Sequence, residues 1–384
     1  MSRQALLASR TLTPAGFEPG RCVVIDAGRI DAIVPAADCP RDAERHELDG
    51  DLLPGFIDLQ VNGGGGVLFN DDPTVEGIAA IAAAHRAFGT TALLPTLISD
   101  DLDVVARAID AVRAAIARKV PGVIGIHLEG PFLNAARKGI HDASKFGNLD
   151  KAAVALLSSL GAGCTLVTLA PERAPPGATH ALAGRGVIVA AGHTDGSYEE
   201  ISAALQEGVS GFTHLFNAMS QFGSRAPGAV GAALDHRDAW CGIIVDGHHV
   251  HPAALRVALA AKGPERLALV TDAMPTVGSE RRSFSLGGVT IVAEDGRCTA
   301  PDGTLAGSDL DMAQAVRNAE RLMRIDYATA ARMASAAPAR ALGIHCERGE
   351  IRAGLAADLV LMDARKHAVQ TWSAGEPQLA SATR

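Results

Sequence analysis

From about residue 53 onward, short apolar runs alternate with longer, Ala-rich segments. Segments such as 75–88, 102–119 and 150–160 repeat apolar residues every three or four positions, which is typical of α-helices. The apolar runs between them are expected to be strands, at 55–60, 91–97, 122–128, 164–169, 186–191, 211–214, 241–246 and 267–272. Eight strand–helix alternations predict an α/β fold, a (β/α)8 TIM-type barrel, with an open doubly wound sheet as the alternative.

The two ends of the chain have a different pattern, made of short β-like pieces. Runs 21–26 and 29–34 flank a turn at Ala27–Gly28 and predict a hairpin, and a similar signal returns where 349–354 leads into 357–362. We therefore predict that residues 1–52 and 350–384 form one small β-sandwich domain built from both termini. Residues 53–349 then form the catalytic barrel. Two independent terminal hairpins are the alternative.

After residue 272 the alternation loosens into a segment rich in Gly and turn residues. We expect a β excursion here, with strands at 283–292 and 295–299, before helices resume at 309–324 and 328–336. The run Gly63–Gly66 follows the first predicted barrel strand, but it fits a flexible loop better than a nucleotide-binding fingerprint.

Composition narrows the class of protein. Apolar residues make up 48% of the 384 residues, enough for a large core, and the formal charge of −8 comes without a basic stripe, which argues against nucleic-acid binding. The six cysteines contain no CxxC pair, and no run is long and apolar enough for a membrane span or an export signal. We expect a cytoplasmic protein with no nucleic-acid or membrane partner.

Polar side chains gather where five of the predicted strands end, the barrel face on which active sites lie. They are His127 and Glu129, His193, His214, the segment from Asp246 to His249, and Asp272. Glu129, His193 and His214 supply one carboxylate and two imidazoles, the ligands of a catalytic zinc site with an open position. His127 is expected to support these ligands rather than to join them.

Asp272 has a separate predicted role. A carboxylate beside a metal can accept a proton from an attacking water and pass it to a leaving amine. The alternative is a helix cap or a further structural ligand.

Six ordered motifs make the resemblance to a known family specific. They are HLEGPF at 127–132, KGIH at 138–141, AGHTDG at 191–196, THLFNAM at 213–219, DGHHV at 246–250 and LVTDAM at 269–274. Together with LPGFIDLQVNG at 53–63 and the tail at 354–363, they cover nearly the whole chain. The chain resembles the N-acetylglucosamine-6-phosphate deacetylases of the amidohydrolase superfamily. The resemblance implies hydrolysis of the acetamide of a small sugar phosphate, with Glu129, His193 and His214 as metal ligands and Asp272 as the catalytic residue.

The same resemblance implies the substrate contacts. His141 would polarise the acetamide carbonyl, while His249, Asn217 and the backbone near Ala218 would hold the sugar phosphate. Arg225 would reach the phosphate in a partner subunit's site, which implies a homodimer. His248 and His251 have no assigned role, and His251 stands where relatives often have Asp.

One departure concerns the number of metal ions. Many amidohydrolases begin with His-x-His and bind two metals, but this chain has Gln60 and Asn62 at those positions. An amide is a poor zinc ligand, so we expect one divalent metal per subunit, zinc or ferrous iron. The competing functions are deacetylation of N-acetylgalactosamine 6-phosphate, a cyclic amidase such as dihydroorotase, which normally keeps the two-metal start, and a non-catalytic sugar-phosphate-binding barrel.

Overall fold

The computed structural model describes residues 3–379 and contains a barrel of eight parallel strands. The strands are β6 (Phe56–Val61), β9 (Thr90–Ile98), β10 (Gly125–Glu129), β11 (Cys164–Leu169), β12 (Ile188–Ala191), β13 (Val209–Phe212), β14 (Trp240–Ile244) and β15 (Leu267–Val270). They pair in chain order, and a bridge between Val61 and Ala273 brings the last strand beside the first. The predicted TIM-type barrel is confirmed, and each strand lies within a few residues of its expected position.

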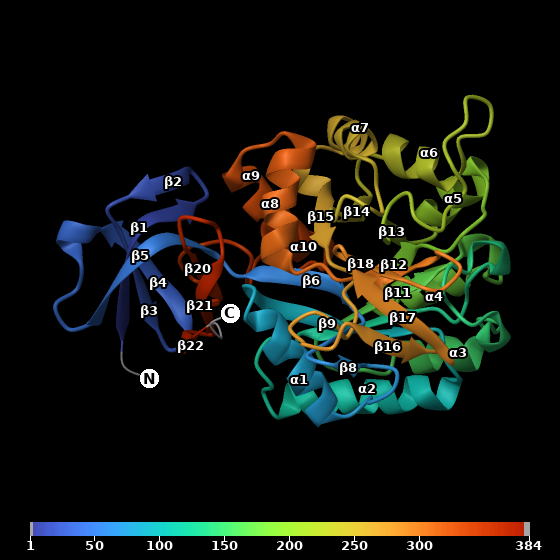
Figure 1. Cartoon of the computed structure of the whole chain (residues 1–384), viewed down its shortest axis with the longest axis horizontal. Coiled ribbons are helices and arrows are strands. Elements are labelled where there is room, and N and C mark those ends of the chain that lie inside the picture. Colours follow the sequence, from blue (N-terminus) through green and yellow to red (C-terminus); the bar gives the residue numbers. More distant parts are fainter. Residues whose placement is uncertain (1–2, 380–384) are drawn as a thin grey trace.

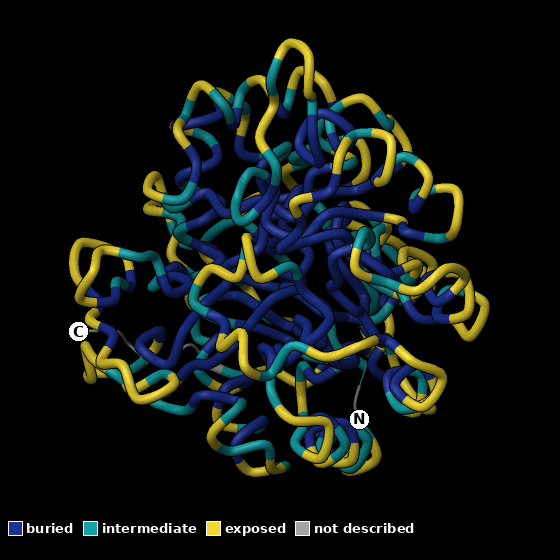
Figure 2. Tube along the Cα trace, turned by 90° about the vertical axis from the view of Figure 1, so that its right-hand side faces the viewer, coloured by how far each residue is buried: buried dark blue, intermediate teal, exposed yellow. Residues whose placement is uncertain are grey.

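Helices cover the outside of the barrel (Figure 1). They are needed there because the strands are buried on both faces, and the outer face requires apolar partners. They are α1 (Val75–Arg86), α2 (Leu102–Ala117), α3 (Lys151–Leu157), α4 (Ala178–Ala183), α5 (Tyr198–Gln206), α6 (Gly228–Asp235), α7 (Pro252–Lys262), α8 (Met312–Met323), α9 (Tyr327–Met333) and α10 (Ala336–Ala341). A capping box at Ser197–Glu200 opens α5, with Ser197 N–H donating to Glu200 Oε2 at 2.8 Å. In Figure 2 burial is concentrated in the strands, whereas the helices and loops around them carry the exposed positions.

Both ends of the chain contribute to one mixed sheet beside the barrel, here called the terminal sheet (Figure 1). Its strands are β1 (Gln4–Thr13), β2 (Gly16–Pro19), β3 (Arg21–Asp26), β4 (Arg29–Pro35), β5 (Glu44–Pro54), β20 (Leu359–Met362), β21 (Ala368–Ser373) and β22 (Glu376–Leu379). The predicted β3–β4 hairpin forms, with positive φ at both Ala27 and Gly28 as its turn requires. The barrel core extends into Leu12, Val360 and Met362 of this sheet, so the two parts pack against each other.

The β excursion after the barrel is a four-stranded sheet made of β16 (Ser283–Leu286), β17 (Val289–Glu294), β18 (Arg297–Thr299) and β19 (Leu305–Ser308). The strand expected over residues 283–292 is in fact a hairpin. Gly287 and Gly288 have φ of 55° and 79°, and two successive positive φ values turn the chain back on itself. A minor two-stranded sheet joins β7 (Gly63–Gly64) and β8 (Val67–Leu68).

Two further differences concern the ends of the chain. Strand β5 was not expected, because its first half alternates exposed charged residues with half-buried ones. The segment 349–354 forms turns rather than a strand. All six cysteines lie within the described residues and are free thiols. No helix in residues 3–379 combines the length and the apolar character that crossing a bilayer requires.

Candidate active site

Glu129, His193 and His214 come from three different strands and meet at the carboxyl end of the barrel. Glu129 is the last residue of β10, His193 follows β12, and His214 follows β13. The two histidines have positive φ values, 48° and 31°, a conformation that costs energy in a residue with a Cβ. The surrounding structure must therefore hold both residues in this conformation.

The three side chains form a buried group that could hold a metal ion, with their ligand atoms all within 4.8 Å of one another. Nε2 of His214 lies 3.0 Å from Glu129 Oε1 and 3.0 Å from Nε2 of His193. The Nδ1–H of His193 donates to the carbonyl of Arg137 at 2.8 Å, which leaves the Nε2 lone pair directed at the group. Two imidazoles and a carboxylate that converge in this way fit a single divalent cation.

Electrostatics also favour positive charge at this point. Burial opposes ionisation of Glu129, but hydrogen bonds from His193 and His214 outweigh it and lower the pKa of Glu129 well below its ordinary value. Burial likewise disfavours a charged His214, yet the hydrogen bond and charge of Glu129 raise its pKa. The group therefore stabilises a cation between its members, whether a proton or a metal ion.

Asp272 follows β15 on the same face and has φ of 53°. Its Oδ1 accepts hydrogen bonds from Gln60 Nε2 at 3.0 Å and Asn62 Nδ2 at 2.7 Å. The Gln60 amide also lies 3.1 Å from both oxygens of Glu129, so it links the two carboxylates. Burial and then the charge of Glu129 raise the pKa of Asp272 to about 6. Gln60 and Asn62 thus act as hydrogen-bond donors to the carboxylates of the site.

His141 lies beside this group, with its ring centroid 4.4 Å from that of His193. The backbone N–H of Ser99 donates to His141 Nδ1 at 3.3 Å, and the Ser99 hydroxyl lies 2.8 Å from the same atom. A ring nitrogen that accepts a backbone N–H carries no proton, so the proton of the neutral ring is on Nε2. Burial and then His193 lower the pKa of His141 to about 3, which keeps the ring neutral. Ser99 was not identified from the sequence.

A cavity of about 270 Å³ brings together eight of the nine site residues that the sequence predicts. They are Glu129, His141, His193, His214, Asn217, Ala218, His249 and Asp272. His249 is held by Asp246, whose Oδ2 accepts from Nδ1 at 2.6 Å. Thr304, Leu305 and Gly307, which the sequence did not identify, close one wall from the β excursion.

Arg225 is the one predicted site residue that the cavity of its own chain does not include. It is exposed in the loop between β13 and α6. The lining of the cavity contains no lysine or arginine from the described residues, although a phosphate would require a cationic partner.

The remaining histidines of the motifs have structural contacts. His127 Nε2 lies 2.7 Å from the Thr168 hydroxyl inside the barrel, away from the Glu129 group. His248 Nε2 donates to the carbonyl of Asp295 in the excursion at 2.9 Å, and His251 caps α7 by accepting from Ala253 N–H. His251 therefore has a local structural role, whereas the support of the metal ligands by His127 stays a prediction.

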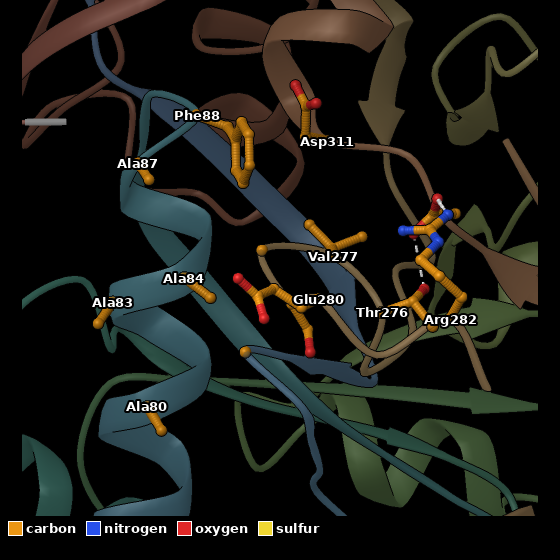
Figure 3. A pocket seen from close by; sticks show the side chains of 14 residues that line it. Ala80, Ala83, Ala84, Ala87, Phe88, Thr276, Val277, Glu280, Arg282 and Asp311 are labelled. Carbon is orange, nitrogen blue, oxygen red and sulfur yellow. Dashed lines mark hydrogen bonds and ion pairs between the residues drawn. The ribbon is translucent and has the colours of Figure 1, made fainter. Parts of the chain in front are cut away.

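A larger cavity of about 880 Å³ lies outside the barrel, between α1 and the loop 276–282 (Figure 3). Its helical wall consists of small residues such as Ala80 and Ala84, and Arg282 on its other side pairs with Asp309. It contains none of the predicted site residues, so size alone does not locate the active site.

The parallel barrel, with a carboxylate and two imidazoles at its carboxyl end, defines the class as a metal-site hydrolase of the TIM-barrel type. The chain belongs to the amidohydrolase family, whose sequence profile matches residues 52–382. It is 44% identical over 327 residues to an N-acetylgalactosamine-6-phosphate deacetylase of Shewanella, covering 85% of this chain and 83% of that protein.

Two solved structures have the same fold over nearly their whole length. The N-acetylglucosamine-6-phosphate deacetylase of Pasteurella multocida has a TM-score of 0.94 and 32% identity, covering 98% of this chain and 100% of that one. A mutant of the Mycobacterium smegmatis enzyme in complex with N-acetyl-D-glucosamine 6-phosphate has a TM-score of 0.90 and 32% identity, covering 98% and 99%. The family resemblance found in the sequence is confirmed.

Proposed function

We propose that this protein is a metal-dependent deacetylase of N-acetylhexosamine 6-phosphates. The substrate we assign is N-acetyl-D-glucosamine 6-phosphate, which is hydrolysed to D-glucosamine 6-phosphate and acetate in amino-sugar catabolism. The observation that carries this proposal is the meeting of the Glu129, His193 and His214 group with Asp272 and His141 in one cavity. Hydrolysis of an unactivated amide needs three kinds of group. The metal group provides the electrophile, Asp272 accepts the proton, and His141 donates a hydrogen bond to the developing oxyanion.

The acetamide would bind with its carbonyl oxygen between the metal group and His141. A single zinc or ferrous ion held by Glu129, His193 and His214 would supply Lewis-acid polarisation of the carbonyl and of the attacking water. The Nε2–H of His141 donates a hydrogen bond to the carbonyl oxygen as negative charge develops there. Its fixed tautomer, set by the Ser99 N–H, means that the donor is in place before the substrate arrives.

Asp272 transfers the proton that the reaction moves. Because the amides of Gln60 and Asn62 both bond to Oδ1, Oδ2 is the oxygen that receives the proton from the attacking water. Asp272 then delivers this proton to the nitrogen of the breaking C–N bond, so the amine leaves neutral. The acetic acid that forms releases its remaining proton to solvent and becomes acetate. A carboxyl group with a pKa near 6 is suited to take up and release a proton near neutral pH.

The rest of the cavity would hold the sugar and its phosphate. His249, Asn217 and Ala218 line the cavity, and Asp246 holds the His249 ring in position. We assign the phosphate to Arg225 of a second subunit, because a guanidinium forms two parallel hydrogen bonds with phosphate and the cavity lining of this chain has no cation of its own within the described residues.

N-Acetylgalactosamine 6-phosphate is the second candidate substrate. The Shewanella relative at 44% identity bears that activity in its name, whereas the two structural relatives act on, or bind, the glucosamine epimer. The epimers differ only in the direction of one hydroxyl group on the sugar ring, so the walls that surround the ring decide between them.

Acetate release from a panel of N-acetylated sugars tests both the proposed deacetylase activity and the assignment of the glucosamine epimer. The panel contains both epimers with and without the 6-phosphate, assayed with added zinc or iron and with chelator. We expect release only from the phosphorylated sugars, its loss in chelator, and a higher kcat/KM for the glucosamine epimer. A higher kcat/KM for the galactosamine epimer reverses the substrate assignment, and release from neither phosphate defeats the proposed function.

A further inference from the structure

A basic pocket of about 540 Å³ opens between α8 and the turn that joins β20 to β21. Its walls carry four cationic side chains, Arg317, Arg321, Arg365 and Lys366, and a single carboxylate, Glu320. The pocket shares no lining residue with the active-site cavity. Figure 1 shows α8 on the side of the barrel that faces the terminal sheet, so the pocket lies where these two parts of the molecule meet.

Most of the positive charge in this pocket is not neutralised. Glu320 is used by Lys366, whose Nζ lies 2.6 Å and 2.7 Å from its two carboxylate oxygens. Arg317 donates to two neutral oxygens, the carbonyl of Lys366 at 2.6 Å and the side chain of Gln314 at 2.8 Å.

The other two guanidinium groups have weaker contacts. Among residues 3–379, Arg321 reaches only the Asn318 amide oxygen, at 3.3 Å. Arg365 has no side-chain hydrogen bond or ion pair to any of residues 3–379. Three guanidinium groups therefore surround one space without a carboxylate among their partners.

This arrangement costs energy unless an anion is present. Arg317 and Arg321 are four residues apart on α8, so their like charges lie one turn from each other on the same face. Arg365 adds a third charge from the facing turn. The whole chain has more acidic than basic residues and a formal charge of −8, so this local excess of cations does not follow from its composition. An anion in the pocket would remove the repulsion and complete the hydrogen bonds of Arg321 and Arg365.

We propose that this pocket binds a small phosphate monoester. The planar fork of a guanidinium matches two oxygens of a phosphate, and three such groups suit a dianion better than a monovalent halide. Ile325 and Ala364 supply an apolar part of the wall against which the uncharged portion of the ester lies. The volume is within the range of small-ligand sites. The ligand connects α8 of the barrel to the β20–β21 turn of the terminal sheet, so its binding stabilises the folded protein.

Titration calorimetry with inorganic phosphate and with glucose 6-phosphate, at constant ionic strength set by chloride, tests this proposal. The variants are R321Q/R365Q, the active-site phosphate variant R225Q, and R237Q as a matched control, since Arg237 is exposed and outside both cavities. In R225Q we expect phosphate still to bind with the affinity of this pocket and glucose 6-phosphate to bind more tightly than phosphate. When R321Q/R365Q is added to R225Q, the affinities for phosphate and for glucose 6-phosphate should both fall by about tenfold or more.

The outcomes distinguish this pocket from the active site. R237Q should bind as the parent does. R321Q/R365Q alone should keep full deacetylase activity and should melt no lower than the parent in chloride buffer, because it loses two mutually repelling charges. Phosphate binding that disappears in R225Q, or that R321Q/R365Q leaves unchanged, overturns the proposal. Glucose 6-phosphate that binds no tighter than phosphate overturns the assignment to an ester. None of these results depends on which sugar the active site deacetylates.

Discussion

At the scale of single residues, the carboxylate of Asp272 is positioned by two side-chain amides, which neither ionise nor belong to the metal-binding group. The amides of Gln60 and Asn62 hold one oxygen of Asp272 and leave the other for the proton. Because both amides donate to it, Asp272 is oriented even though burial and Glu129 raise its pKa. Its orientation and its ability to change protonation state therefore have separate structural origins.

Replacing Asp272 with Asn should abolish most turnover, because an amide cannot accept the proton of the attacking water. We expect kcat to fall by roughly 10²–10⁴-fold, the usual contribution of a general acid–base group. Metal analysis of the same preparation should still find one ion per subunit, since Glu129, His193 and His214 are untouched. Near-normal acetate release from a fully metal-loaded D272N protein would reject the assigned role.

His141 and Ser99 provide a graded test of the oxyanion donor. His141→Ala removes the Nε2–H and should lower kcat by about 10²–10³-fold with a smaller change in KM. Ser99→Ala keeps the backbone N–H that fixes the tautomer and removes only the hydroxyl, so we expect a loss of about tenfold or less. Steady-state kinetics on both variants decides the point. Equal losses would mean that the hydroxyl, rather than the tautomer, controls the ring.

The sequence identified the residues that meet at the site but not how they are held. His193, His214 and Asp272 could be placed because each follows an apolar run, and the ends of parallel strands share one face. Gln60 and Asn62 were considered only as missing metal ligands. Their hydrogen bonds to Asp272 depend on side-chain rotamers and on the closure of β6 against β15, which periodicity does not encode.

At the scale of elements, the buried apolar strands were the most predictable part of the fold, because a run that is hydrophobic on both faces fits little else. Strand β5 was not found, since half of it is exposed and charged and only its neighbours β1 and β20 give it a place. The hairpin β16–β17 was read as one strand because its Gly287–Gly288 turn is only two residues long. Local patterns thus locate interior elements better than edge elements, whose pairing depends on distant parts of the chain.

Helix α1 carries a buried histidine that should make stability depend on pH. His85 Nε2 donates to the carbonyl of Gly63 at 2.9 Å, and burial lowers the pKa of His85 to about 4, below its value near 6.5 in the unfolded chain. The unfolded state then binds more protons between these values, so the contribution is full above pH 6.5 and is lost as the pH falls toward 4. The loss amounts to about 3 kcal/mol.

Comparison with His85→Gln isolates this contribution from those of other titrating groups. The amide can still donate to Gly63 but does not titrate. Urea unfolding at several pH values should give a stability difference between parent and variant that is constant above pH 6.5. Below that, the difference should shift in favour of the variant down to pH 4. A difference that stays constant over the whole range would show that His85 is not held neutral in the folded state.

At the scale of the whole molecule, the active site lacks the charge that its proposed substrate needs. The walls of its cavity contain carboxylates, amides and imidazoles, and among the described residues no lysine or arginine lines it. Arg225 is exposed together with Phe222, whose side chain is 64% exposed, on the same loop. An exposed aromatic residue on the same loop as an arginine that has no ion pair with residues 3–379 is typical of a contact surface. A two-fold dimer would place the loop of each subunit on the other.

Mixing two inactive variants tests whether Arg225 acts across such a dimer. D272N keeps Arg225 but has no proton acceptor, and R225A keeps Asp272 but cannot bind the phosphate. If each site takes Arg225 from its neighbour, a mixed dimer contains one intact site and one doubly defective site. After the subunits are unfolded together and refolded, random pairing makes half of the dimers mixed, so activity should return to roughly a quarter of the parent value. Size-exclusion chromatography with light scattering establishes the dimer beforehand. If Arg225 instead served its own subunit, no site in the mixture would be intact, and activity would stay at the average of the two variants.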